Sequence, residues 1–150
     1  MESTKAAKAR AYFEQGYNCA QSVFAAFCEE MGLEEAFALR LSSSFGGGVG
    51  GLREVCGAFS GMVMVLGALK GYDMPDDRET KMKHYESVQA LAKKFEAQYD
   101  TIICRDLLAS HQIVPSPIPA DRDAAYYAKR PCARYVEFCT KLLEDGLAGR

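Results

Sequence analysis

The side chains of this 150-residue sequence best suited to chemistry are its six cysteines: Cys19, Cys28, Cys56, Cys104, Cys132 and Cys139. A cysteine thiolate is both a nucleophile and a ligand for soft metals, so these residues point to redox chemistry or metal binding. None of the six forms a Cys-x-x-Cys pair, which excludes the sequence signatures of zinc knuckles and thioredoxin-like sites. Spacing alone therefore assigns no reaction.

Position relative to the expected helices is more informative. Asn18 is a helix-capping residue type and Pro131 suits the first position of a helix, and a cysteine follows each of them directly. The cysteines expected near helix starts are Cys19, Cys56, Cys104 and Cys132. Free N–H groups and the helix dipole favour negative charge in the first turn, so this placement predicts lowered thiol pKa values and reactive thiolates.

The other two cysteines are expected inside helices, Cys28 beside Phe27 and Cys139 beside Phe138. A cysteine in such a position usually behaves as a small buried apolar residue, so we expect both to pack in the core. The same interpretation can be extended to all six cysteines, because free cysteine is among the most buried residue types. The positions of the residues leave both interpretations open.

The elements that must position these cysteines are predicted to be helices. Apolar periodicity, caps and glycine stops place them at residues 3–14, 18–31, 34–41, 52–69, 78–99, 101–110 and 131–144. Residues 114–119 carry three prolines and are expected to form an extended loop. Sustained period-two alternation is absent, so we predict an all-α single domain over 1–150, a compact bundle of about six to seven helices.

Glycines precede and line the apolar helix expected at the centre of this bundle. Gly46, Gly47 and Gly48 belong to a run too glycine-rich for a helix or strand, and their amides are candidates to bind an anion, the sulfides of a cluster or the Cys56 thiolate. Gly57 and Gly61 are spaced to leave one helix face bare, so another backbone or a bulky group can approach. The formal G-x-G-x-x-G match lacks the βαβ context of dinucleotide binding.

Composition excludes several classes of partner. The formal net charge is −2 and no basic run occurs, so neither nucleic acid nor an anionic membrane is expected as a partner. The apolar run 55–69 is shorter than the roughly 20 residues that cross a bilayer, which predicts no membrane insertion. Residues 1–8 lack the apolar core of a secretory signal, so cytoplasmic residence and reduced thiols are expected.

The string Cys56-Gly-Ala-Phe-Ser-Gly61, with glycines before it and Asn18-Cys19-Ala-Gln upstream, resembles the motif of a bacterial family of redox-active proteins named C-GCAxxG-C-C. The resemblance spans most of the chain. The family's remaining cysteines map to Cys19, Cys104 and Cys132, the set that helix placement selects. Cys28 and Cys139 fall outside the family pattern.

The resemblance implies a redox or metal-binding role without naming a substrate. Two chemistries are consistent with it. In one, the four thiolates hold an iron–sulfur cluster or another soft metal; in the other, Cys56 attacks a disulfide or oxidant and a neighbouring cysteine resolves the product. Either needs a redox partner protein, which the sequence does not identify, and a homodimer stays open. The alternative is a non-catalytic helical binding or assembly module whose cysteines only pack.

Overall fold

Most of the chain described by this computed structural model, residues 4–148, is helical, and no strand forms within it. The predicted all-α class is confirmed. The elements are α1 (Thr4–Glu14), α2 (Cys19–Ala25), α3 (Cys28–Met31), α4 (Glu35–Ser42), η1 (Ser43–Phe45), α5 (Gly46–Val49), α6 (Gly57–Lys70), α7 (Arg78–Tyr99), α8 (Cys104–Ala109), α9 (Ala124–Lys129) and α10 (Cys132–Leu147). Ser3, the predicted first residue of the first helix, lies outside the described residues, as do Gly149 and Arg150.

The predicted helices differ from the observed ones mainly where the chain extends to pair with another segment. α7 has the predicted bounds, whereas the helix predicted for 18–31 breaks at Phe27 into α2 and α3. The helices predicted from residues 52 and 101 begin later, because the backbone ahead of both is extended and Val55 pairs with Ile103. The short helix α9 was not predicted.

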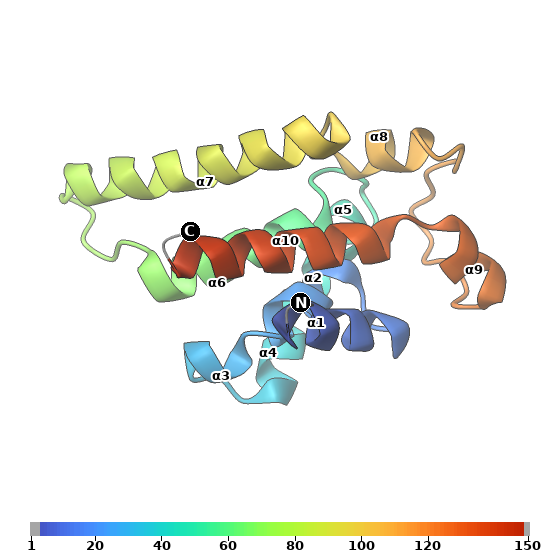
Figure 1. Ribbon diagram of the computed structural model, residues 1–150, viewed down its shortest axis with the longest axis horizontal. Helices are drawn as coiled ribbons and strands as arrows, with labels where there is room; N and C mark the ends of the chain where they lie inside the picture. Colours follow the sequence, from blue (N-terminus) through green and yellow to red (C-terminus); the bar gives the residue numbers. More distant parts are fainter. Residues whose placement is uncertain (1–3, 149–150) are drawn as a thin grey trace.

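The helices form three layers (Figure 1). α7 lies along one side, α6 and α10 occupy the middle, and α1, α3 and α4 lie on the opposite side. α2 packs most extensively against α6, and α10 packs against α1, α2 and α6. The fully buried residues Phe13, Phe95, Met62 and Val136 come from four different helices of this core. No helix of residues 4–148 is both long enough and apolar enough to cross a bilayer.

The close packing of α2 on α6 depends on a bare helix face, as the glycine spacing predicts. A Cβ atom at Gly61 would lie 2.8 Å from the carbonyl oxygen of Ala20, and one at Gly57 would lie 2.9 Å from the Cys19 sulfur. Both separations are shorter than real Cβ contacts. The two helices therefore approach to a distance that any side chain at these positions would prevent.

The glycine-rich segment ahead of α6 includes α5, whose Gly47 and Gly48 have non-helical φ and ψ, so it is a left-handed turn and not a regular helix. Residues 47 to 51 all have positive φ, between 55° and 83°. The turn is closed when the amides of Arg53 and Glu54 donate to the carbonyls of Gly47 and Gly48, both at 2.9 Å. Val49 shares this conformation at φ 70°, which costs an L-residue with a side chain about 1–2 kcal/mol. Four glycines in the turn avoid that cost.

Two substitutions in α6 test the close approach. We predict that Gly61→Ala lowers the free energy of unfolding by about 1–3 kcal/mol, because the new methyl group meets the backbone of α2. Gly67→Ala is the matched control on the same helix, since a Cβ there meets no atom within 4 Å, and it should raise stability by up to about 1 kcal/mol through helix propensity. Urea unfolding of both variants provides the measurement; equal effects would contradict the close approach.

Candidate functional site

Four cysteines lie at helix starts, as the sequence predicts. Cys19, Cys104 and Cys132 are the first residues of α2, α8 and α10, and Cys56 is the N-cap of α6. The helix α8 and the first turn of α10 lie toward the same end of the molecule, at the right of Figure 1. Four segments far apart in the sequence therefore supply this set of thiols.

A capping box fixes the start of α2. The side-chain oxygen of Asn18 accepts a hydrogen bond from the amide of Gln21 at 2.9 Å, and the Gln21 side chain accepts one from the Asn18 amide at 3.0 Å. The Asn18 side chain also donates to the carbonyl of Ser43. These bonds satisfy amides at the helix start and fix the point at which α2 begins, with Cys19 as its first residue.

A short antiparallel pairing brings the starts of α6 and α8 together. The amide of Cys56 donates to the carbonyl of Ile102 at 2.7 Å, and the amide of Cys104 donates to the carbonyl of Glu54 at 2.6 Å. Val55 and Ile103 form the bridge between these bonds. The backbones of Cys56 and Cys104 are therefore held on either side of one bridge, before any side-chain contact is considered.

Glycines bring the Cys19 sulfur into the same region. The bare Cα of Gly57 leaves room for it, and the amide of Gly47 in the left-handed turn faces it. Burial, and after it the sulfur of Cys104, raise the pKa of the Cys19 thiol, while the amides of Cys19 and Gly47 oppose that rise. Cys19 is therefore close to the glycine turn, to the start of α6 and to Cys104.

The thiols lie near enough to influence one another. Burial, then Cys19 and Cys139, raise the pKa of Cys56 well above its ordinary value. Burial, then Cys19 and Cys104, raise the pKa of Cys132 to about 12. Cys19 is thus the central member of a thiol cluster formed by Cys19, Cys56, Cys104 and Cys132.

The predicted lowering of the thiol pKa values is wrong for three of these cysteines. The amide of Phe59 does lower the pKa of Cys56, but burial has the larger effect. A helix terminus contributes about 0.3–1 kcal/mol, whereas the rise of the Cys132 pKa to about 12 corresponds to several times that energy. Helix-start placement therefore brings the thiols together without making Cys19, Cys56 or Cys132 acidic.

Cys28 and Cys139 pack in the core, as expected, but the expected position of Cys28 inside a helix is wrong. Cys139 is fully buried, as expected of a packing residue, yet burial and then the Cys19 sulfur raise its pKa, so it borders the thiol cluster. Cys28 starts α3 instead of lying inside a helix. It is buried and belongs to the packed core.

Exposure divides the thiol cluster. Cys56 is only 4% exposed, whereas Cys19, Cys104 and Cys132 are partly exposed. All six cysteines are free thiols. Among residues 4–148, no group of three or more His, Cys, Asp or Glu side chains is placed to hold a metal ion. Burial raises the pKa of the Cys19 and Cys132 thiols, so the partial exposure of these two residues does not extend to a solvated sulfur.

Arg53 contacts a different cysteine from the one that lies near it in the sequence. It lies close to Cys56 along the chain, but its Nη1 atom is 3.7 Å from the sulfur of Cys104. Its Nε donates to the carbonyl of Ser116 at 2.8 Å, which ties the predicted proline loop to the site. Arg105, next to Cys104 in sequence, instead pairs with Glu54 at 3.1 Å.

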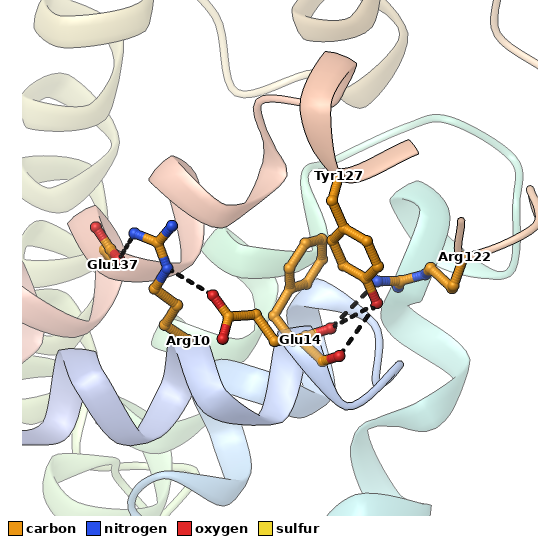
Figure 2. A network of polar contacts seen from close by, with 6 residues as sticks. Arg10, Glu14, Arg122, Tyr127 and Glu137 are labelled. Carbon is orange, nitrogen blue, oxygen red and sulfur yellow. Dashed lines mark hydrogen bonds and ion pairs between the residues drawn. The ribbon is translucent and has the colours of Figure 1, made fainter. Parts of the chain in front are cut away.

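Arg122 and Tyr126 are site residues that the sequence analysis missed. The guanidinium of Arg122 lies over the rings of Phe13 and Tyr126, at 4.6 and 4.5 Å from their centroids. It donates to the carbonyls of Phe13 and Tyr17, and Figure 2 shows it reaching the end of α1 together with Tyr127. Burial raises the pKa values of Cys19 and Cys132, and the positive charge of Arg122 opposes part of that rise. A lone arginine in a loop carries no sequence signal of this placement.

Comparison with known protein families gives a match that covers most of the chain. The model of a family described as "Putative redox-active protein (C_GCAxxG_C_C)" matches residues 17–145. Within the match, residues 56–61 have the order Cys-Gly-Ala-Phe-Ser-Gly, with Cys-Gly where the family's printed motif has Gly-Cys. No curated protein and no solved structure matches the chain. The matched span includes the whole thiol cluster.

The raised thiol pKa values predict a loss of stability in alkaline solution. Between the ordinary thiol pKa and the raised native one, the unfolded chain releases a proton that the folded chain keeps, so stability falls as pH rises. For Cys132 this window runs from about 8.5 to about 12. We predict that Cys132→Ser reduces the decline between pH 8.5 and 9.5 by up to about 1.4 kcal/mol. Urea unfolding under reducing conditions measures it; equal declines would contradict the burial effect.

Proposed function

Because this chain belongs to the C_GCAxxG_C_C family, whose model matches residues 17–145, we propose that it carries out redox chemistry at Cys19, Cys56, Cys104 and Cys132. The observation that carries the proposal is the gathering of four helix starts, which puts four free thiols within electrostatic reach of one another. We propose thiol–disulfide exchange as the reaction, in a reducing cytoplasmic compartment and with a partner of the disulfide class.

Cys104 is the thiol that attacks first in this proposal, in place of the Cys56 favoured by the sequence motif. Cys56 is almost fully buried, and burial raises the pKa of its thiol. Access of an external disulfide to this sulfur is therefore restricted. Cys104 is partly exposed and has the Arg53 guanidinium 3.7 Å from its sulfur. Within the thiol cluster, Cys104 is therefore a partly exposed residue whose sulfur contacts a positively charged side chain.

The proposed exchange proceeds in two displacements. The Cys104 thiolate bonds to one sulfur of the partner disulfide, the S–S bond breaks, and its electron pair leaves with the other sulfur as a thiolate that takes up a proton. The Cys19 thiolate then attacks the Cys104 sulfur and releases the second partner thiolate, which is protonated in turn. Cys104 and Cys19 together lose two electrons and two protons, and the partner disulfide becomes two thiols.

Single substitutions test this order. With bis(2-hydroxyethyl) disulfide as oxidant, Cys104→Ser should slow thiol loss about tenfold or more, because the first displacement loses its nucleophile. Cys19→Ser should instead accumulate a mixed disulfide on Cys104, because the resolving thiol is gone. Cys28→Ser is the matched control and should react as the unchanged protein does. Mass spectrometry after rapid alkylation follows each species.

Two outcomes would count against the assignment. A Cys104→Ser variant that reacts at the original rate would remove Cys104 from the first step. Thiols that react only after the protein is denatured would favour the non-catalytic alternative, a binding or assembly module in which all six cysteines pack.

A metal-thiolate site is the second candidate, and the donor set favours it. Four cysteine thiols are the ligands that an iron–sulfur cluster or another soft metal takes, and a cation would offset the repulsion among four thiolates. Cys19, Cys56, Cys104 and Cys132 would be the ligands, and a bound cluster would supply one-electron transfer. The side-chain placement described above does not form a group of metal-binding geometry, so this candidate requires the thiols to rotate toward one another.

Metal analysis separates the two candidates. For protein purified without oxygen, the dithiol proposal predicts well under one iron or zinc per chain together with reversible oxidation of two thiols. The metal-thiolate candidate predicts one zinc, or iron with inorganic sulfide, and loss of that metal in Cys104→Ser but not in Cys28→Ser. Stoichiometric metal in the unchanged protein would overturn the dithiol proposal.

A further inference from the structure

Guanidinium groups gather around the partly exposed thiols. Arg53 contacts the Cys104 sulfur and otherwise bonds the neutral carbonyl of Ser116. Arg122 bonds two neutral carbonyls and lies over Tyr126, and Arg130 lies over the same ring, 5.0 Å from its centroid. Three positive charges therefore surround the part of the site that solvent reaches.

These charges are not neutralised by ion pairs. The ion pairs of residues 4–148 include Arg10 and Arg105, but none of them includes Arg53, Arg122 or Arg130. The Asp123 carboxylate, next to Arg122 in sequence, accepts a hydrogen bond from the Tyr126 amide as the cap of α9. Among residues 4–148, Arg53, Arg122 and Arg130 are therefore guanidinium groups near the thiols without an ion-pair partner.

The guanidinium groups interact electrostatically with the thiols. Arg122 lies close enough to affect both Cys19 and Cys132, and Arg130 lies close enough to affect Cys132. With Arg53 on Cys104, each partly exposed thiol has a guanidinium neighbour. A molecule that approaches the Cys104 sulfur therefore meets the positive charge of Arg53.

We infer that the substrate is a small acidic disulfide, one that carries carboxylates beside its S–S bond. The inference rests on the proposed thiol–disulfide exchange at Cys104. The carboxylates are drawn to Arg53, Arg122 and Arg130 while the disulfide reaches the Cys104 sulfur, since opposite charge raises the local concentration of a ligand and its rate of association. The same guanidinium groups stabilise the thiolate that leaves when the substrate S–S bond breaks.

Three small disulfides of different charge test the inference on the reduced, full-length protein at one pH. Oxidised glutathione is anionic, bis(2-hydroxyethyl) disulfide is neutral and cystamine is cationic. The rate of mixed-disulfide formation at Cys104 is divided by the rate for the same protein unfolded in urea, which removes differences in intrinsic reactivity. At about 20 mM ionic strength the normalised rate for glutathione disulfide should exceed that for cystamine about tenfold, and the ratio should shrink at about 0.5 M.

Matched variants assign the effect to the guanidinium at the sulfur. Arg53→Gln should lower the anionic-to-cationic ratio about threefold or more, and Arg53→Lys should keep most of it, because the charge is retained. Arg105→Gln removes a nearby guanidinium that is paired with Glu54 and should change the ratio by less than about twofold. Should Arg53→Gln fail to fold, the salt dependence of the unchanged protein still tests the attraction of the anionic disulfide, and an absent salt dependence would overturn the inference.

The outcomes separate this inference from the proposed function. Equal normalised rates for the three disulfides, or a preference for cystamine, would overturn the acidic substrate and leave thiol–disulfide exchange standing. No reaction at Cys104 with any of them would overturn the exchange itself. A large effect of Arg105→Gln equal to that of Arg53→Gln would show general surface charge in place of a substrate site.

Discussion

A Cβ atom at position 57 would lie 2.9 Å from both the Cys19 sulfur and the carbonyl oxygen of Phe45. The thiol cluster depends on this close approach, because it lets the start of α6 lie directly against the start of α2. Gly61 extends the same contact one turn further, against the backbone of Ala20. With bulkier residues at these positions, Cys19 and Cys56 would be separated, and the central thiol would lose its neighbours.

The other two helix starts reach the cluster through backbone geometry. In the left-handed turn of residues 47 to 51, the first two carbonyls, of Gly47 and Gly48, accept hydrogen bonds from the amides of Arg53 and Glu54. The carbonyl of Glu54 in turn accepts a hydrogen bond from the amide of Cys104. The turn, the bridge between Val55 and Ile103 and the start of α8 therefore form one connected unit. The strained Val49 in that turn costs about 1–2 kcal/mol, which the surrounding hydrogen bonds must offset.

Much of the structure could be predicted from short-range sequence patterns. Asn18 and the bare faces of Gly57 and Gly61 have short-range causes, so the sequence predicted the cap of α2 and the close packing of α6. The pairing of Val55 with Ile103 joins residues 48 positions apart, and no local pattern encodes it, so α6 and α8 were predicted to start too early.

The limits of prediction at the site have similar causes. Helix-start placement identified the four cysteines, but the sign of the pKa shifts of Cys19, Cys56 and Cys132 depends on burial, which only the packed structure defines. The contact of Arg53 with Cys104 depends on the left-handed turn that precedes Arg53. Arg122 reaches the cluster from a loop by way of aromatic rings far away in sequence.

The central claim is that Cys19, Cys56, Cys104 and Cys132 form one redox unit. Its most direct test is to equilibrate the reduced protein with buffers of increasing disulfide-to-thiol ratio and to map the cysteine pairs by mass spectrometry. The account predicts a reversible disulfide joining Cys104 to Cys19 first, with Cys28 remaining a thiol throughout. Oxidation of Cys28 ahead of the cluster, or the absence of any reversible disulfide within it in protein free of metal, would contradict the account.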